Sequence, residues 1–222
     1  MRSRVWRRTS AIVCVLVLVF ITVCSCGSKE TVGPEKMMDA FYRLLIYQDT
    51  KPIVKLGIDQ EEAKETLSDY REAMAAAIQK QFSAADISIS HTQAEDILDE
   101  MRGALKKLDY KVTVEEQSGK KASVQIASES IPYQDIFKKA SDKTIRELKP
   151  WHIEKLSDAK DLVVTNVKEG FRNVKPSSGK RKKTFELKKK KIKSGKNTLL
   201  VFFPVDAEDM GSQIMNLAIG KS

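Results

Sequence analysis

Residues 110–126 read YKVTVEEQSGKKASVQI, and this stretch decides the fold class. Apolar and polar residues alternate on both sides of the short segment 118–120, which reads Ser-Gly-Lys. Such alternation is typical of two strands that each bury one face. The stretch therefore predicts an antiparallel hairpin with one buried and one wet face.

A second hairpin is predicted further along the chain, with strands at 181–193 and 197–203 and a turn at Ser194-Gly195. The other segments carry apolar residues at helical spacing. Helices are expected at 34–48, from Asp59 onward, from Thr92 onward, at 132–148, at 158–172 and from about Asp206. Strands that occur only as hairpins imply an antiparallel sheet on which the helices pack. The predicted fold class is α+β, with two β-hairpins forming an antiparallel sheet packed against about six helices.

Two of these helices are expected to begin with a capping box, in which the first side chain and one three residues later satisfy backbone N–H groups. Asp59 with Glu62 and Thr92 with Glu95 show this spacing. The apolar residues that follow are expected to face the core, including the methionines of the first and last helices. The methionines are therefore interpreted as packing residues.

The first 25 residues differ in composition from the rest. Residues 1–10 hold four arginines and no acidic residue, and residues 11–23 are apolar or small without a charge. A basic stretch before a short apolar run is typical of an export signal, and thirteen residues are too few for a comfortable membrane span. A simple transmembrane anchor is the alternative interpretation.

The end of this segment resembles the lipobox of bacterial lipoproteins. An aliphatic residue, Val23, lies three positions before Cys26, and the small residue Ser25 directly precedes it. The resemblance implies that a diacylglyceryl group is attached to the thiol of Cys26, with acyl chains such as palmitate, and that signal peptidase II cuts on its amino side. Cys24 is a poorer candidate because Val23 is bulky, and a cysteine at position 24 departs from the usual pattern.

These features divide the chain into three parts. Residues 1–25 are expected to be a lipoprotein signal peptide, 26–33 a lipidated tether, and 34–222 a single α+β extracytoplasmic domain. Two or more acyl chains hold a protein stably on a membrane. The expected location is the outer face of the cytoplasmic membrane, at the extracellular side of the cell envelope.

The segments Cys-Gly-Ser-Lys-Glu from Cys26 and Gly-Pro-Glu-Lys-Met-Met-Asp-Ala-Phe from Gly33 look like lipoproteins of low-GC Gram-positive bacteria. The closing stretch 206–215 is also similar to that group. The mature part of these proteins is a domain of unknown function, and some resemble cystatin-like or nuclear-transport-factor-like folds, in which a curved sheet surrounds a helix. The resemblance implies no activity and carries over no catalytic residue.

Basic residues are concentrated in one segment. Four of the 39 basic residues and none of the 30 acidic residues lie in residues 1–25, so the remainder holds 35 against 30. Residues 180–196 hold ten of these bases and the single acid Glu186. A basic hairpin is therefore expected to project from a slightly acidic body. The ten residues are Lys180, Arg181, Lys182, Lys183, Lys188, Lys189, Lys190, Lys191, Lys193 and Lys196.

This hairpin has a functional and a structural interpretation. An exported basic surface fits anionic phospholipid headgroups or wall teichoic acids, to which each lysine contributes about 1 kcal/mol near the layer. Alternatively, the lysines form a solvated strand face and protect a sheet edge from mispairing. Nucleic acid is not an expected partner, because Phe185 alone interleaves the bases where stacking requires several aromatic residues.

No pattern points to an enzyme. Carboxylates cluster at 95–100 and at 206–209, where they suit the first turns of helices. His91 and His152 are far apart, and no cofactor or metal site is predicted. No disulfide is expected, since Cys14, Cys24 and Cys26 all lie in or at the end of the leader. The main hypothesis is a non-enzymatic binding module for an unknown envelope partner. The alternative is an envelope hydrolase with a cleft in the curved sheet. A further variant of the binding module would hold a ligand in an apolar cavity.

Overall fold

The structure is a computed structural model that describes residues 31–148 and 156–221. Cys26, the expected signal peptide and His152 lie outside these residues. Within them the chain forms seven helices and five strands, and the α+β prediction is confirmed. The elements in order are β1 (Thr31–Val32), α1 (Pro34–Ile46), α2 (Lys51–Lys55), α3 (Gln60–Ser83), α4 (His91–Leu105), β2 (Tyr110–Ser118), β3 (Lys121–Ser128), α5 (Tyr133–Leu148), α6 (Leu156–Asn173), β4 (Arg181–Ser194), β5 (Asn197–Pro204) and α7 (Ala207–Ala218).

The strands form one open sheet in the order β1-β5-β4-β3-β2. Strands β2 to β5 are antiparallel to their neighbours, and β1 runs parallel to β5. Both predicted hairpins are confirmed, with turns at Gly119 and Gly195, where φ is +55° and +53°. Strand β4 joins the two hairpins, because its residues 181–188 pair with β3 and its residues 187–194 pair with β5.

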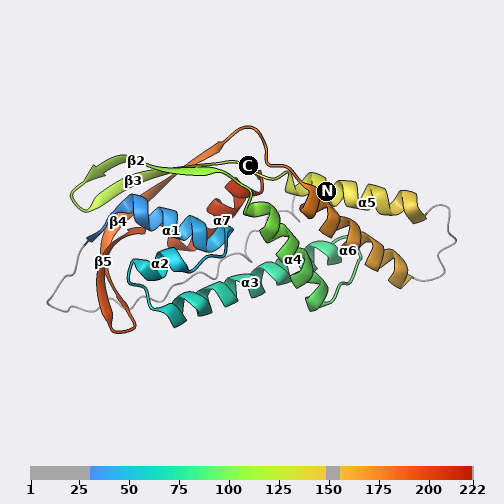
Figure 1. The fold of residues 1–222 in the computed structure, drawn as a ribbon, viewed down its shortest axis with the longest axis horizontal. Coiled ribbons are helices and arrows are strands. Elements are labelled where there is room, and N and C mark those ends of the chain that lie inside the picture. The colour runs from blue at the N-terminus through green and yellow to red at the C-terminus, as the bar shows by residue number, and fades with distance from the viewer. Residues whose placement is uncertain (1–30, 149–155, 222) are drawn as a thin grey trace, which may run out of the picture.

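The sheet curves around α1 at one end of the long axis of the molecule, and α5 and α6 extend to the other end (Figure 1). Helix α1 contacts β2, β3 and β5, while α7 contacts β4 and β5. Helix α4 packs between α3 and α6, and α6 in turn packs against α5. The molecule therefore has a sheet-and-helix end and a helical end.

Helix α1 forms the centre of the core. Its predicted apolar stripe is buried, and Tyr42 beside it is fully buried as well. The Tyr42 ring stacks on Tyr110 of β2 with centroids 3.9 Å apart, and its hydroxyl lies 2.6 Å from the Ser128 hydroxyl of β3. These contacts attach the first hairpin to α1. The stripe consists of Met37, Met38, Phe41, Leu44 and Leu45.

Two features of the helix starts differ from the sequence-based expectation. Helix α4 is capped by Ser90 with Gln93, so the predicted Thr92 cap is wrong. Both pairs have capping-box spacing, and Ser90 is the residue that takes the extended conformation a cap requires. Helix α3 is capped by Asp59 as expected, although the carboxylate of Glu62 binds elsewhere.

Two short elements were not predicted. Helix α2 has five residues, too few to show a helical period. Strand β1 has two residues, Thr31 and Val32, which lie in the segment expected to be a tether. The structure therefore has one helix more than the six expected, and the end of the tether segment is part of the sheet.

Candidate functional site

The ten basic residues of 180–196 do not form one surface. Lys180 makes an ion pair with Asp109 at 2.6 Å, which holds the pKa of that carboxyl below its ordinary value. Arg181 donates hydrogen bonds of 3.2 Å to the backbone carbonyls of Gly220 and Lys221, just beyond α7. These two side chains therefore fasten the start of β4 to its surroundings.

The other end of β4 meets lysines from the first hairpin. Lys188 lies opposite Lys121 in the register of β3 and β4, and the backbone N–H of Lys189 donates to the carbonyl of Lys120 at 2.8 Å. Lys120 and Lys121 were not among the predicted site residues, because sequence patterns do not show which strands pair. We call the resulting group the lysine cluster: Lys120, Lys121, Lys188, Lys189, Lys190, Lys191, Lys193 and Lys196.

The two halves of β4 bury different sets of residues, with four consecutive lysines between them. Phe185 and Leu187 are buried, but further along the strand Ile192 and Ser194 are the buried residues, although the register with β5 is continuous. Because successive side chains of a strand point to opposite faces, the first half of β4 is buried on the face of its odd residues and the second half on the face of its even residues. Side chains at 188–191 are mostly exposed.

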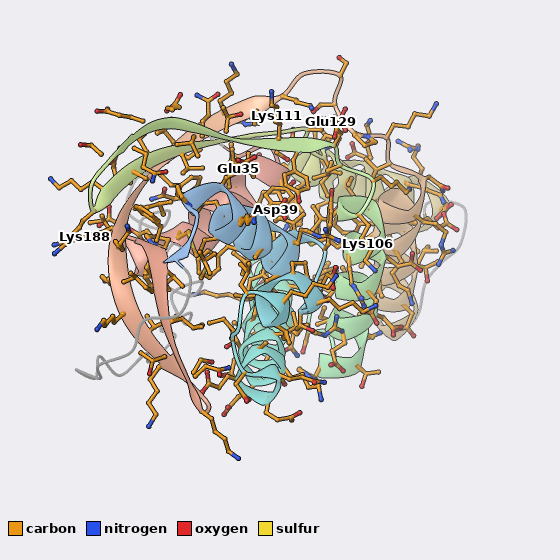
Figure 2. All side chains as sticks on the ribbon, turned by 60° about the vertical axis from the view of Figure 1, so that its left-hand side comes forward. Glu35, Asp39, Lys106, Lys111, Glu129 and Lys188 are labelled. Carbon is orange, nitrogen blue, oxygen red and sulfur yellow. The ribbon has the colours of Figure 1, made fainter. Side chains whose placement is uncertain are left out.

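Aromatic residues of β5 support two of these lysines. The Lys189 ammonium lies 5.1 Å from the centre of the Phe202 ring. The Lys190 ammonium lies 5.5 Å from the centre of the Phe203 ring. Such contacts let the aliphatic stems cover apolar surface while the charges stay in water. Lys188 points outward from the curved sheet, and Glu35 and Asp39 lie on α1 (Figure 2).

The turn of the second hairpin does not project freely, contrary to expectation. Ser194 is fully buried; its hydroxyl accepts a hydrogen bond of 2.7 Å from the Asp59 backbone N–H and donates to the Glu62 carboxylate. The same carboxylate accepts the Gly195 N–H at 2.9 Å. The start of α3 therefore clamps the turn, and the lysine cluster lies on a fixed support.

The carboxylates of α4 hold helices together. Asp96 pairs with Lys168 of α6 at 2.7 Å, and Asp99 pairs with Arg71 of α3 at 3.0 Å. Glu100 pairs with Arg172, which raises the pKa of that guanidinium. These pairs agree with the structural interpretation of the cluster at 95–100. Because water screens these exposed pairs, each contributes little to stability.

The remaining candidates stay dispersed. His91 is partly exposed, with its Nε2 3.4 Å from a Glu72 carboxylate oxygen. Asp206 precedes α7 without a capping hydrogen bond from its side chain, and Asp209 is exposed. Among residues 31–148 and 156–221, no group of three or more His, Cys, Asp or Glu side chains could hold a metal ion. No helix in the part of the chain that the structure describes is long and apolar enough to cross a membrane.

Comparisons with known proteins bear on the fold. No family model and no curated protein matches the chain. A solved structure of a protein described as a "putative lipoprotein (ycdA)" from Bacillus subtilis matches with a TM-score of 0.61 and 17% sequence identity. The match covers 83% of this chain and 55% of the Bacillus chain, so this chain spans about half the length of that protein. At this identity the likeness shows a shared fold.

Proposed function

We propose that this chain is an exported lipoprotein, held at the outer face of the cytoplasmic membrane by a diacylglyceryl group on Cys26. Its domain is a non-enzymatic binding module of the cell envelope, and its lysine cluster contacts a layer that carries anionic phosphate groups. The lipobox-like segment before Cys26 supports the anchor. The fold shared with a Bacillus protein described as a "putative lipoprotein" is consistent with it.

The observation that carries the binding role is the convergence of two hairpins. Lysines from the first turn and from the second hairpin meet at one end of the sheet, on a strand whose turn is clamped to α3. A fixed group of like charges repels itself, which opposes folding, and a polyanion relieves that repulsion. Four lysines near an anionic layer contribute about 4 kcal/mol, nearly a thousandfold in affinity.

Edge protection is the competing explanation for the same lysines. Pairing between β3 and β4 ends at Lys188, while β4 continues to Ser194 alongside β5. Lysine side chains at such a step disfavour the addition of a foreign strand. This explanation accounts for the lysines of β4, but it gives no reason for Lys120 and Lys121 to lie beside them.

The anchor is tested by labelling growing cells with a fatty-acid analogue. We expect Cys26→Ala to abolish incorporation of the label and to leave the uncleaved precursor. Cys24→Ala is the matched control, because it removes a thiol two residues away and should leave labelling intact. Unchanged labelling of Cys26→Ala would contradict the proposed function.

A further inference from the structure

The point at which the chain joins the sheet lies beside the lysine cluster. Thr31 and Val32 of β1 pair with Leu200 and Val201 of β5. Across β5, those two residues pair with Lys191 and Lys190 of β4. Neighbouring strands are about 4.8 Å apart, so the backbone of β1 lies about 10 Å from the middle of the cluster.

Strand polarity sets the direction from which the chain arrives. Strand β1 is parallel to β5, and β5 begins at the clamped turn. Thr31, the first residue of β1, therefore lies at the end of β1 that is nearer to that turn, where Lys193 and Lys196 lie. Five peptide units separate Cys26 from Thr31 and can span at most about 18 Å.

The helical end of the molecule lies far from this point. Helices α5 and α6 occupy the opposite end of the long axis from the turn of the second hairpin (Figure 1). The bases at the start of β4 are also remote from the clamped turn: Lys182 and Lys193 are separated by about 36 Å along the strand. Lys180 and Arg181 are in addition held by Asp109 and by the backbone carbonyls of Gly220 and Lys221.

We propose that the lysine cluster rests on the anionic headgroups of the bilayer that holds Cys26. The domain then stands with its hairpin end on the membrane, and α5 and α6 point away from it. This inference rests on the lipid anchor proposed above. Because the anchor keeps the cluster within a few nanometres of the headgroups, their effective concentration is high. A bilayer is therefore favoured over a wall polymer as the occupant.

The orientation is measured with single cysteines in the full, processed lipoprotein. Cleavage removes Cys14 and Cys24, and lipid blocks Cys26, so an introduced cysteine is the one reactive thiol. Ser118→Cys places a fluorophore at the exposed turn beside the lysine cluster, and Ser141→Cys places it on the exposed face of α5. The protein is reconstituted in vesicles of equal parts phosphatidylglycerol and phosphatidylcholine that contain a headgroup nitroxide quencher.

We expect quenching at position 118 to exceed quenching at position 141 several-fold. The difference should collapse in phosphatidylcholine alone, at high salt, and when Lys120, Lys121, Lys188 and Lys193 are replaced by Gln. Replacement of four bases at the helical end, Lys138, Lys139, Arg146 and Lys160, removes the same charge and should leave the difference in quenching unchanged. Circular dichroism verifies that both variants are folded.

The possible outcomes separate the two proposals. A reactive thiol in the protein without an introduced cysteine, together with failure to stay with the vesicles, would overturn the anchor. Retention on the vesicles with equal quenching at the two positions, or with more at 141, would overturn the orientation alone. Loss of quenching at 118 upon addition of soluble poly(glycerol phosphate) would reassign the cluster to a wall polymer.

Discussion

The clamp on the second hairpin leads to a quantitative prediction for Ser194→Ala. The substitution removes the acceptor of the Asp59 N–H and the donor to the Glu62 carboxylate, both at a fully buried position. A neutral hydrogen bond contributes about 0.5–1.5 kcal/mol and one to a charged group about 1.5–3 kcal/mol. Glu62 keeps its bond from Gly195, so we expect the free energy of unfolding to fall by about 2–3 kcal/mol.

Thermal and urea unfolding of the mature lipoprotein in mild detergent, followed by circular dichroism, measures this loss. For a domain of this size each kcal/mol lowers Tm by about 2–4 °C. Ser118→Ala makes the same change in the exposed turn of the first hairpin and should alter stability by less than about 0.5 kcal/mol. Amide exchange at 194–196 should also accelerate in Ser194→Ala. Equal stability of the two variants would refute the clamp.

Two further predictions concern the backbone and the tyrosines. Gly57 has φ +101°, and a Cβ there would lie 2.8 Å from Cδ2 of Leu199, so Gly57→Ala should lower the free energy of unfolding by more than about 1 kcal/mol. A Cβ at Gly103 in α4 would meet nothing within 4 Å, so Gly103→Ala should raise the free energy of unfolding by about 0.5–1 kcal/mol. Thermal unfolding of the two variants checks the contrast. Burial raises the pKa of Tyr42 and Tyr110 above the ordinary 10.0, which means that folding favours the neutral phenols. Stability should therefore hold below pH 10.0 and decline as the pH rises above it, and tyrosinate absorbance with an ordinary pKa in the folded protein would contradict this assignment.

Local patterns were sufficient to predict most elements. The stripe of α1 and the alternation of β2 and β3 depend on neighbours within a few residues, and these elements have the predicted faces. The start of α4 was misplaced because Ser90 and Thr92 carry overlapping cap patterns, and only the backbone conformation decides between them.

Long-range pairing could not be predicted from the same patterns. The pairing of β3 with β4 crosses the whole of α5 and α6, and no periodicity within either strand specifies its partner. The sequence therefore predicts that Lys120 and Lys121 lie in or beside the turn of the first hairpin, but not that this turn lies next to β4. Glu62 has the spacing of a cap residue, but Ser194 and Gly195 lie close enough in space to take its carboxylate instead.

The order of the strands makes the helical end separable in principle. Strands β2 to β5 follow one another in the sheet as they do in the chain, which is a meander. Ser128 at the end of β3 lies opposite Arg181 at the start of β4, so residues 129–180 leave and return at the same corner. The segment 129–180 could therefore be lengthened, shortened or replaced without a shift in the register of any strand. Such a change would affect stability mainly through α4, because α6 packs against it.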